Sequence, residues 1–360
     1  MRFLIRFLCL VVGLMSSAEA APQLWQAFTK AAMKHATFQK TNFGTGTELK
    51  VVLEKNAKSG LLETGIIPVS NTDTAIASWN AITPDNTWLE VEIRAQIGTH
   101  WTRYYKIARW TNVGEKHSFT TEHDSDGRIN TDTLKLTKAA QALQLRIHLH
   151  SSAAGITPTL TGLAVVSSLS SQHYTASNTK SNQTAWGLEL AVPVHSQMIY
   201  PDGGEVWCSP TSVTMILGYW DAKLGTKTAD SVPEAAKIMW DTAYDGSGNW
   251  VFNTAYAASK GLKAYVHRLS SLAQAEAYIQ KGIPLALSIA WGVRELEGAH
   301  IAKSNGHVVV LRGFTKTGDV IINDPAAKTD AGVRTVYQRA QLERAWIGHS
   351  GGVVYVIEGK

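Results

Sequence analysis

Several segments in the first half of the chain alternate between apolar and polar residues. In 87–94, leucine, valine and isoleucine stand at every second position between charged residues, and 143–150 repeats the alternation. A third candidate strand covers 48–54. Alternation with a period of two is typical of antiparallel strands that bury one face. Because no long helical pattern separates these segments, residues 21–166 are predicted to form an all-β sandwich or jelly-roll domain.

The second half of the chain has mixed periodicity. Helices are expected to begin near Cys208, near Pro233, at Asn253 and at Ser271. The expected strands cover 262–269, 283–290, 308–314, 319–323 and 353–357. Since helices come first and strands crowd together late, residues 185–360 are predicted to form an α+β domain around an antiparallel sheet. The intervening segment, 167–184, is rich in serine, threonine, asparagine and glutamine, which indicates a linker.

The N-terminus has the pattern of a secretory signal peptide. Arg2 and Arg6 precede an apolar run over 8–15, and Ala18-Glu19-Ala20 is typical of a cleavage site. Residues 1–20 are therefore predicted to be removed, which places the mature protein outside the cell, in the periplasm or in the cell envelope. The apolar run is shorter than the ~20 residues of a membrane-spanning helix. We expect no integral membrane segment after cleavage, and a monomer.

Composition and charge narrow the classes of partner. The chain has 34 basic and 29 acidic residues, which gives a formal charge of +5. This excess is small and scattered, without a basic stripe, so nucleic acid is not an expected partner. Weak association with an anionic cell envelope is compatible with the charge.

No cofactor or metal is expected. The run Asp124-Ser125-Asp126-Gly127 resembles the start of a calcium-binding loop. The twelfth position of such a loop carries an acidic ligand, and here it is Lys135. We therefore predict a hairpin turn at this point.

Cys208 is the only cysteine outside residues 1–20. It follows a glycine-rich loop and opens an apolar helical run, so its thiol is predicted to lie at a helix N-terminus. A free cysteine is often a small buried apolar residue. A helix N-terminus, however, stabilises the thiolate of a nucleophile. An unpaired thiol in an exported protein favours the nucleophile, because an oxidising compartment offers it no protection.

A histidine and an acid are predicted to lie together on neighbouring strands. His307 opens the strand 308–314, and Asp324 follows the strand 319–323. If these strands pair as a hairpin, His307 lies opposite residue 326, and Asp324 is its diagonal neighbour at ~7 Å or less. Thiol acyl transfer needs such a set: a nucleophile, a histidine that takes its proton, and an acid that orients the histidine.

Further candidates lie on either side of the thiol. Gln197 precedes Cys208 by eleven residues, and its amide is a candidate donor to a developing oxyanion beside the backbone N–H of Cys208. Trp207 and Ser209 adjoin the thiol and are candidate substrate contacts.

A later loop offers two more substrate contacts. The segment 244–250 is rich in glycine and aromatic residues, which is typical of a loop that faces substrate. Asn249 and Trp250 are its candidate contacts. The same composition is equally typical of a structural turn anchored by Trp250, and both interpretations stay open.

These candidates coincide with the motifs of a known family. The relevant blocks are Gln197, Trp207-Cys208-Ser209-Pro210-Thr211-Ser212, Gly306-His307 and Asn323-Asp324-Pro325. They resemble the Gln, Cys-Gly-Pro-Ala, Gly-His and Asp-Pro motifs of the bacteriocin-processing cysteine peptidases, a papain-like group. The closer resemblance is to stand-alone secreted relatives with an N-terminal β-sandwich, because Ser78-Trp79-Asn80 and 131–134 are similar to that sandwich.

The resemblance implies a fold and a set of roles. It implies a papain-like catalytic domain in which Cys208 is the nucleophile, His307 the base and Asp324 its orienting acid. It also implies that Gln197 is the oxyanion donor. The chain departs from the family pattern at Ser209, where the motif has glycine, and it lacks the phosphate-binding loop of an ATP-binding cassette.

Two hypotheses from different classes follow. The first is a secreted cysteine hydrolase that cleaves peptide or other amide bonds of a peptide or peptidoglycan-like substrate through a thioester acyl-enzyme. The alternative is a non-catalytic protein of the cell envelope that binds glycan or peptide on a papain-like scaffold.

Overall fold

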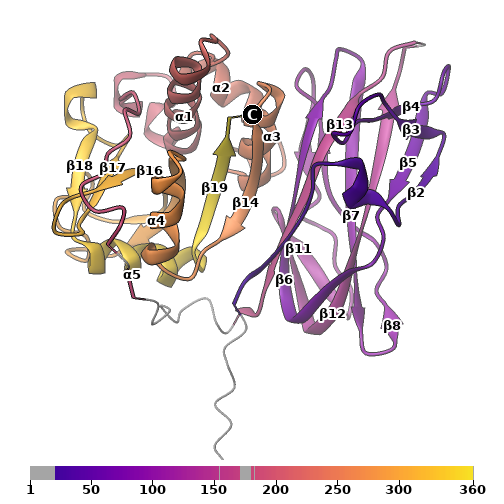
Figure 1. Ribbon diagram of the computed structural model, residues 1–360, viewed down its shortest axis with the longest axis horizontal. Coiled ribbons are helices and arrows are strands. Elements are labelled where there is room, and N and C mark those ends of the chain that lie inside the picture. Colours follow the sequence, from indigo (N-terminus) through magenta and orange to yellow (C-terminus); the bar gives the residue numbers. More distant parts are fainter. Residues whose placement is uncertain (1–20, 154, 171–179, 182, 360) are drawn as a thin grey trace, which may run out of the picture.

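The computed structural model describes residues 21–153, 155–170, 180–181 and 183–359, which form two domains side by side (Figure 1). The predicted signal peptide lies outside the described residues, as do 171–179 and 182 of the predicted linker. The last strand of the first domain runs to Ser168, two residues beyond the predicted end of that domain at 166.

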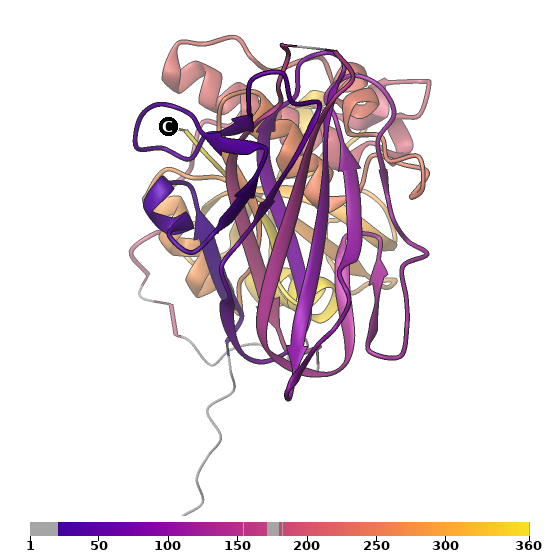
Figure 2. The same ribbon diagram turned by 90° about the vertical axis from the view of Figure 1, so that its right-hand side faces the viewer.

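The described part of the first domain is built almost entirely from strands, with one short 3-10 helix, η1 (Lys30–Met33). The strands are β1 (Gln23–Ala27), β2 (Thr37–Gln39), β3 (Thr41–Phe43), β4 (Val51–Leu53), β5 (Ser59–Glu63), β6 (Ile67–Ile82), β7 (Thr87–Ile97), β8 (His100–Trp101), β9 (Tyr105–Trp110), β10 (His117–Ser118), β11 (Gly127–Asn130), β12 (Thr133–Ser151) and β13 (Thr159–Ser168). Their main hydrogen-bonded order is β10-β9-β7-β12-β6-β13-β4-β3. Figure 2 shows them stacked in front of the second domain. The predicted all-β sandwich-like domain is thus confirmed, and β7 alternates strictly between buried and half-buried residues.

The second domain places helices around a six-stranded sheet. Its helices are α1 (Cys208–Leu224), α2 (Val232–Met239), α3 (Trp250–Ser259), α4 (Leu272–Gln280) and α5 (Arg339–Ser350), with the 3-10 turns η3 (Gln197–Ile199), η4 (Gly204–Val206) and η5 (Asp330–Gly332). Its strands are β14 (Lys263–Arg268), β15 (Leu285–Trp291), β16 (Ser304–Phe314), β17 (Val320–Asn323), β18 (Arg334–Tyr337) and β19 (Val353–Glu358). The order is β14-β19-β15-β16-β17-β18, and every neighbouring pair is antiparallel. This confirms the predicted α+β domain with an antiparallel sheet.

Three details of the second domain differ from the sequence-based expectation. Helix α3 begins at Trp250 with Asn249 as its N-cap, so the predicted start at Asn253 is wrong by one turn. Nearly the whole of α3 is buried, and a helix buried on all sides has no amphipathic period that marks where it begins. The periodicity also missed β18, a short edge strand, and α5, whose N-cap makes no side-chain hydrogen bond.

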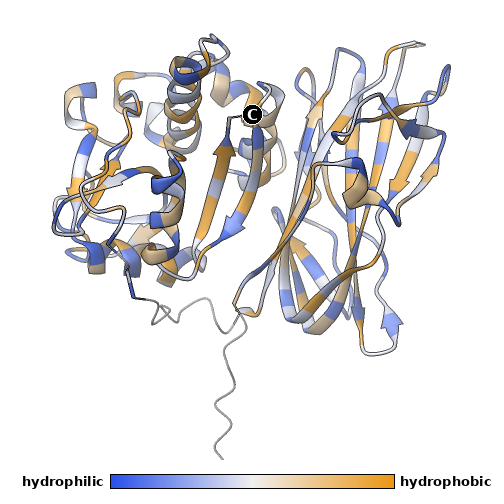
Figure 3. Ribbon diagram, viewed as in Figure 1, coloured by the Kyte–Doolittle hydropathy of each residue, from blue (hydrophilic) through white to orange (hydrophobic). Residues whose placement is uncertain are grey.

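The sheet of the second domain separates two apolar layers. Residues of α1, α2 and α3 pack on one face in a core that continues into the sandwich, whereas α4 and α5 pack on the other face. Figure 3 shows β19, near the middle of this arrangement, apolar along almost its whole length. None of the helices in the described part of the chain has the length and apolar character that a bilayer crossing requires.

The sandwich covers the free edge of the second sheet. Strand β14 is an edge strand, which leaves a row of unpaired backbone groups. Asn80 on β6 donates to the carbonyl of Ala264 and accepts from its N–H at 3.0 Å, and Ser78 accepts from the N–H of Val266 at 2.9 Å. The side chains of β6 therefore complete the hydrogen bonds of β14 and fix the two domains against each other.

Aromatic rings fill the space beside these polar contacts. Phe252 of α3 packs edge-on against Trp110 and Trp79 of the sandwich, with ring centroids 5.1 and 6.3 Å away. Both tryptophans are fully buried. Aromatic pairs of this geometry stabilise by ~0.5–1.5 kcal/mol beyond the area they bury. The interface is therefore a packed core that holds both walls of the cleft described below in one position.

Candidate active site

Helix α1 positions the thiol. Its residues 209–217 are all buried, and it ends at Gly225, whose φ of 69° is a left-handed conformation that glycine adopts without strain. Cys208 is the first residue of the helix and is half-buried. The predicted position at a helix N-terminus is confirmed. Unpaired N–H groups and the helix dipole at this end favour a negative charge on the sulfur.

Strand β16 places the imidazole next to the thiol. Ser212 of α1 donates to the carbonyl of Val308 at 3.0 Å, which ties the first turns of the helix to β16. His307 precedes Val308, is only 4% exposed, and forms a hydrogen bond with the Cys208 thiol. Because His307 Nε2 contacts Asp324, Nδ1 is the ring nitrogen left for the thiol.

The predicted hairpin brings the acid to the histidine. Strands β16 and β17 pair with Val310 opposite Asn323, so His307 lies level with residue 326 in the extended register. Asp324 is fully buried, and its Oδ1 lies 2.7 Å from His307 Nε2. The diagonal contact that the turn spacing predicts is therefore present in the structure.

Burial and charge shift the pKa values of all three groups. Burial alone would lower the pKa of His307, but the charge and hydrogen bond of Asp324, with the thiol, raise it to about 10. Burial would raise the pKa of Cys208, but His307 and the backbone N–H groups of Val308 and Ser209 lower it below its usual value. These shifts favour a thiolate beside an imidazolium at neutral pH.

Two aromatic side chains, those of Tyr337 and Trp291, support Asp324 and His307. The sequence analysis did not identify either of them. Tyr337 of β18 donates to Asp324 Oδ2 at 2.5 Å, and the N–H of Ala326 donates to Oδ1 at 2.9 Å. Trp291, at the end of β15, packs edge-on against His307 with ring centroids 5.7 Å apart. Burial would raise the pKa of Asp324, but the charge and hydrogen bond of His307, with the hydrogen bonds of Tyr337 and Ala326, hold it at about 2. Trp291 covers one side of the imidazole ring. Both lie far from the site in sequence, and no local motif marks them.

Gln197 lies against the loop that leads to the nucleophile. Its side chain is buried, and Nε2 donates to the carbonyl of Gly204 at 2.8 Å. Its Oε1 is buried without a partner among the described residues. Gly204 belongs to η4, the turn directly before α1, and a Cβ there would lie 2.1 Å from the Gln197 carbonyl oxygen. The close packing fixes Gln197 beside the entry to the helix.

The two residues beside the thiol have different surroundings. The indole of Trp207 is half-buried and packs against Tyr200, with ring centroids 5.9 Å apart. The hydroxyl of Ser209 is buried and bonds to Asn253 and Tyr355 at 3.0 and 2.9 Å. That hydroxyl therefore anchors the helix start. Ser209 also lines the cleft described below, and the substrate contact expected of it stays a prediction.

The two loop candidates also differ. Asn249 is buried, caps α3 through the N–H groups of Val251 and Phe252, and donates to Asp241 at 2.8 Å. Its side chain is thus committed to structure, contrary to the expected substrate contact. Trp250 is half-buried and lines a cleft that also contains Cys208 and His307.

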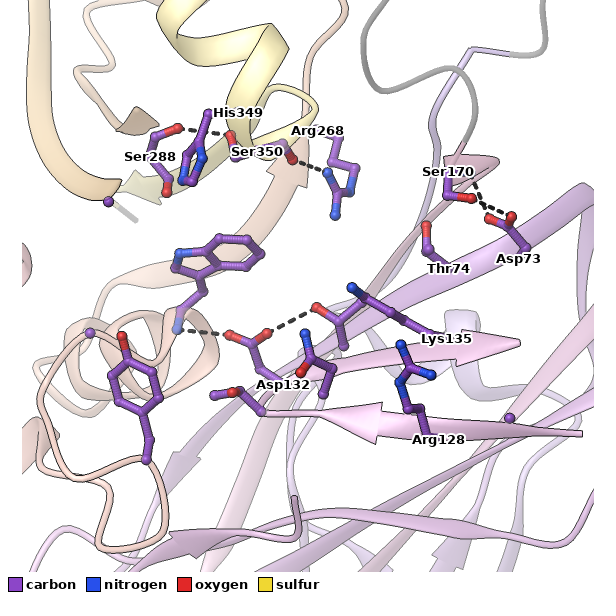
Figure 4. Close-up of a pocket in the computed structure, with 18 of the residues that line it drawn as sticks. Asp73, Thr74, Arg128, Asp132, Lys135, Ser170, Arg268, Ser288, His349 and Ser350 are labelled. Carbon is purple, nitrogen blue, oxygen red and sulfur yellow. Dashed lines mark hydrogen bonds between the residues drawn. The ribbon is translucent and has the colours of Figure 1, made fainter. Parts of the chain in front are cut away.

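This cleft runs between the two domains and has a volume of about 1010 Å³. One wall comes from the second domain and includes Arg268, Ser288, His349 and Ser350, and the facing wall comes from the β11–β12 hairpin of the sandwich (Figure 4). The sequence suggested no such role for this hairpin. It did predict the preceding turn, in which Asp124 Oδ1 accepts from the N–H groups of Asp126 and Gly127. In the described part of the chain, no group of three or more histidine, cysteine or acidic side chains is arranged to hold a metal.

A thiol at a helix start, hydrogen-bonded to an imidazole that a carboxylate orients, is the side-chain arrangement that cysteine peptidases use. Residues 189–353 match the Peptidase C39 like family, and residues 28–168 match the Peptidase C39 N-terminal domain. The second domain therefore belongs to the peptidase C39-like family, and in this chain it follows a C39 N-terminal domain. The match supports a function of the cysteine-peptidase type and does not favour the alternative of a binding protein without activity.

Two solved structures are among those that show some similarity to parts of the chain. A chain from Bacillus anthracis described as a C39-like peptidase is 17% identical, with a TM-score of 0.32, over 48% of this chain and 98% of that one. The C-terminal CBM6 of a laminarinase from Zobellia galactanivorans is 8% identical, with a TM-score of 0.23, over 40% of this chain and 98% of that one. At such low similarity, the ligands of those proteins do not indicate what this chain binds. No curated protein matches the chain.

Proposed function

We propose that this protein is a cysteine hydrolase that cleaves peptide or other amide bonds through a thioester on Cys208. The observation that supports this most strongly is the hydrogen-bonded series of Cys208, His307 and Asp324 on the wall of a large cleft. The C39-like family match of the same domain is independent support.

The proposed reaction begins with attack of the thiolate on the carbonyl carbon of the scissile amide. A C–S bond forms while the carbonyl π electrons move to oxygen. When these electrons return, the C–N bond breaks, and the leaving nitrogen takes the proton of the His307 imidazolium. An amine departs and a thioester remains on Cys208.

Water completes the proposed cycle. It attacks the thioester carbonyl while the now neutral His307 takes a proton from it. The C–S bond then breaks, which releases the acid product and restores the thiolate beside a protonated His307. Asp324 stays ionised throughout, because its part is to orient the ring and stabilise its positive charge.

Two N–H donors are proposed to stabilise the oxyanion: the backbone N–H of Cys208 and the amide of Gln197. One N–H of Gln197 is bound to Gly204, which leaves its second N–H to donate. Loss of one such donor costs roughly 100- to 1,000-fold in kcat in comparable enzymes.

The test is to incubate the full mature chain with peptide and cell-wall-fragment libraries and to weigh the adduct on Cys208. The proposal predicts an acyl adduct on this residue and turnover that Cys208→Ala abolishes. The control is an unchanged unfolding temperature of Cys208→Ala. Full activity in that variant would rule the proposal out.

We further propose an exported protein of two domains. Residues 1–20 act as a signal peptide, 21–166 and 185–360 are the two domains, and the monomeric enzyme works outside the cytoplasm or in the cell envelope. N-terminal sequencing of the exported protein is expected to begin at Ala21, and retention of Met1 would contradict export by cleavage.

A further inference from the structure

The sandwich wall of the cleft carries two cations that face the same way. Strands β11 and β12 pair antiparallel, with Arg128 directly opposite Lys135. Opposed residues of antiparallel strands have side chains on the same face, with Cβ atoms ~4.5–5.5 Å apart. On β11, Gly127 and Ile129 are buried, so Arg128 points away from the sandwich core. Figure 4 shows both side chains rising from the hairpin into the cleft.

Neither cation has a partner in the part of the chain that the structure describes. Among the described residues, the side chains of Arg128 and Lys135 make no hydrogen bond, ion pair or aromatic contact. Like charges directly opposite each other on antiparallel strands destabilise the pairing. The hairpin therefore bears an electrostatic cost that no contact within 21–153, 155–170, 180–181 or 183–359 offsets.

The carboxylates on the same side of the cleft are committed elsewhere. Asp124 binds Arg103 at 2.9 Å, and Asp73 accepts from the N–H and hydroxyl of Ser170 at 2.6 and 2.5 Å. Asp132 accepts from the Thr133 hydroxyl and from a backbone N–H of α3, both at 2.9 Å. Each carboxylate is therefore used in holding a loop or the domain interface, and none neutralises the cationic pair.

We propose that Arg128 and Lys135 bind a carboxylate of the peptide substrate and thereby determine which peptides the cleft accepts. The inference rests on the proposed function, since it places the acidic group in the same cleft as the scissile amide at Cys208. The carboxylate is either an acidic side chain or a free C-terminus. The three aspartates that line the same cleft would repel a polyanion, which favours a ligand with a single negative charge.

The experiment separates binding from turnover. The catalytically disabled Cys208→Ala chain is immobilised and offered pools of random hexapeptide amides that contain either glutamate or glutamine at one position. A second comparison offers the same glutamine pool with a free C-terminal acid. Mass spectrometry measures the capture ratio in each comparison. Hydrolysis of the same pools by the wild-type chain is followed separately.

The expected result is capture of one acidic pool about tenfold or more above its neutral counterpart, the scale of a charge-assisted hydrogen bond. The pool that is enriched identifies the source of the carboxylate. In Arg128→Gln/Lys135→Gln on the same background the ratio falls to about one. Lys237→Gln on α2, an exposed cation away from the cleft, keeps the ratio.

The outcomes distinguish the two proposals. Equal capture, or no capture, of acidic and neutral pools overturns the binding role of Arg128 and Lys135, whatever the wild-type chain hydrolyses. Acid-selective capture without any hydrolysis supports that role and contradicts the proposed hydrolase. The unfolding temperature of Arg128→Gln/Lys135→Gln should stay level or rise, because the variant relieves repulsion. A clear fall would indicate a structural role and count against the proposal.

Discussion

At the residue scale, the site depends on one buried ion pair. His307 and Asp324 are almost inaccessible to water, so each charge needs the other and the hydrogen bonds around it. Tyr337 and the N–H of Ala326 supply two of those bonds to Asp324. The imidazolium that results is the main cause of the lowered pKa of Cys208, against the effect of burial.

Replacing the charge while keeping the shape tests this dependence. In Asp324→Asn, the negative charge that raises the pKa of His307 is lost, so burial should return that pKa to or below its ordinary 6.5. His307 is then neutral at pH 7, Cys208 keeps its proton, and kcat/KM falls roughly 100-fold or more. Tyr337→Phe keeps the carboxylate of Asp324, so its loss of kcat/KM is expected to be smaller. An unchanged pH–rate profile for Asp324→Asn would contradict the role given to Asp324.

The pH dependence of stability has a definite sign for this pair. The folded pKa of Asp324, about 2, lies below its ordinary 3.8, so its stabilising contribution is present above pH ~4 and is lost as the pH falls toward 2. The folded pKa of His307, about 10, lies above its ordinary 6.5, so its contribution is complete below pH ~6.5 and is lost as the pH rises through 10.

At the element scale, two helix starts and one hairpin position the chemistry. Helix α1 presents the thiol, and the β16–β17 hairpin presents the imidazole and carboxylate. Helix α3 carries Trp250 on the cleft wall and depends on the cap formed by Asn249. The cap also links α3 to Asp241, whose carboxylate accepts from Ser118 of the sandwich.

Removal of this cap should weaken the fold more than the site. Asn249→Ala leaves two N–H groups of α3 and one oxygen of Asp241 without partners, so the free energy of unfolding should fall by about 1–3 kcal/mol. Asn249→Ser keeps a capping oxygen and should lose less. Urea unfolding measures the difference. An equal fall in the free energy of unfolding in both variants would show that capping is not the main contribution of Asn249 to stability.

The elements also show what a sequence can predict. The β16–β17 hairpin was predictable because a tight turn fixes the register of two apolar strands, and the register then fixes the contact of His307 with Asp324. The start of α3 was not predictable, because a helix that is buried on all sides has no amphipathic pattern to mark where it begins. Ser209 and Asn249 look like site residues in sequence, and only tertiary contacts show their side chains bonded to the scaffold.

At the scale of the whole molecule, the cleft exists only because the two domains are fixed together. Ser78 and Asn80 complete the edge of β14, and Asp132 accepts from the start of α3. No local sequence pattern indicates which face of a sandwich packs against a second domain. The role of the β11–β12 hairpin as a cleft wall was therefore beyond sequence analysis, which predicted only the turn at 124–127 before β11 and the strand 143–150 within β12.

The interface contains a pH-sensitive carboxylate. Burial raises the pKa of Asp132 to about 6, from an ordinary 3.8, despite hydrogen bonds from Thr133 and Trp250. Because the folded pKa is the higher one, the charged group increasingly disfavours the folded state as the pH rises from about 4 to above 6. Asp132→Asn should therefore gain stability relative to wild type at pH 8 compared with pH 4. A constant difference in unfolding temperature between these pH values would contradict this.

The central claim is that the Cys208 thiol is ionised beside the His307 imidazolium. The rate of alkylation of Cys208 by iodoacetamide, measured against pH on the intact mature chain, tests it most directly. We expect a high rate of alkylation that persists well below the ordinary thiol pKa of 9.0 and that is lost in His307→Ala. A wild-type profile that rises only near pH 9, like that of a free thiol, would contradict the account.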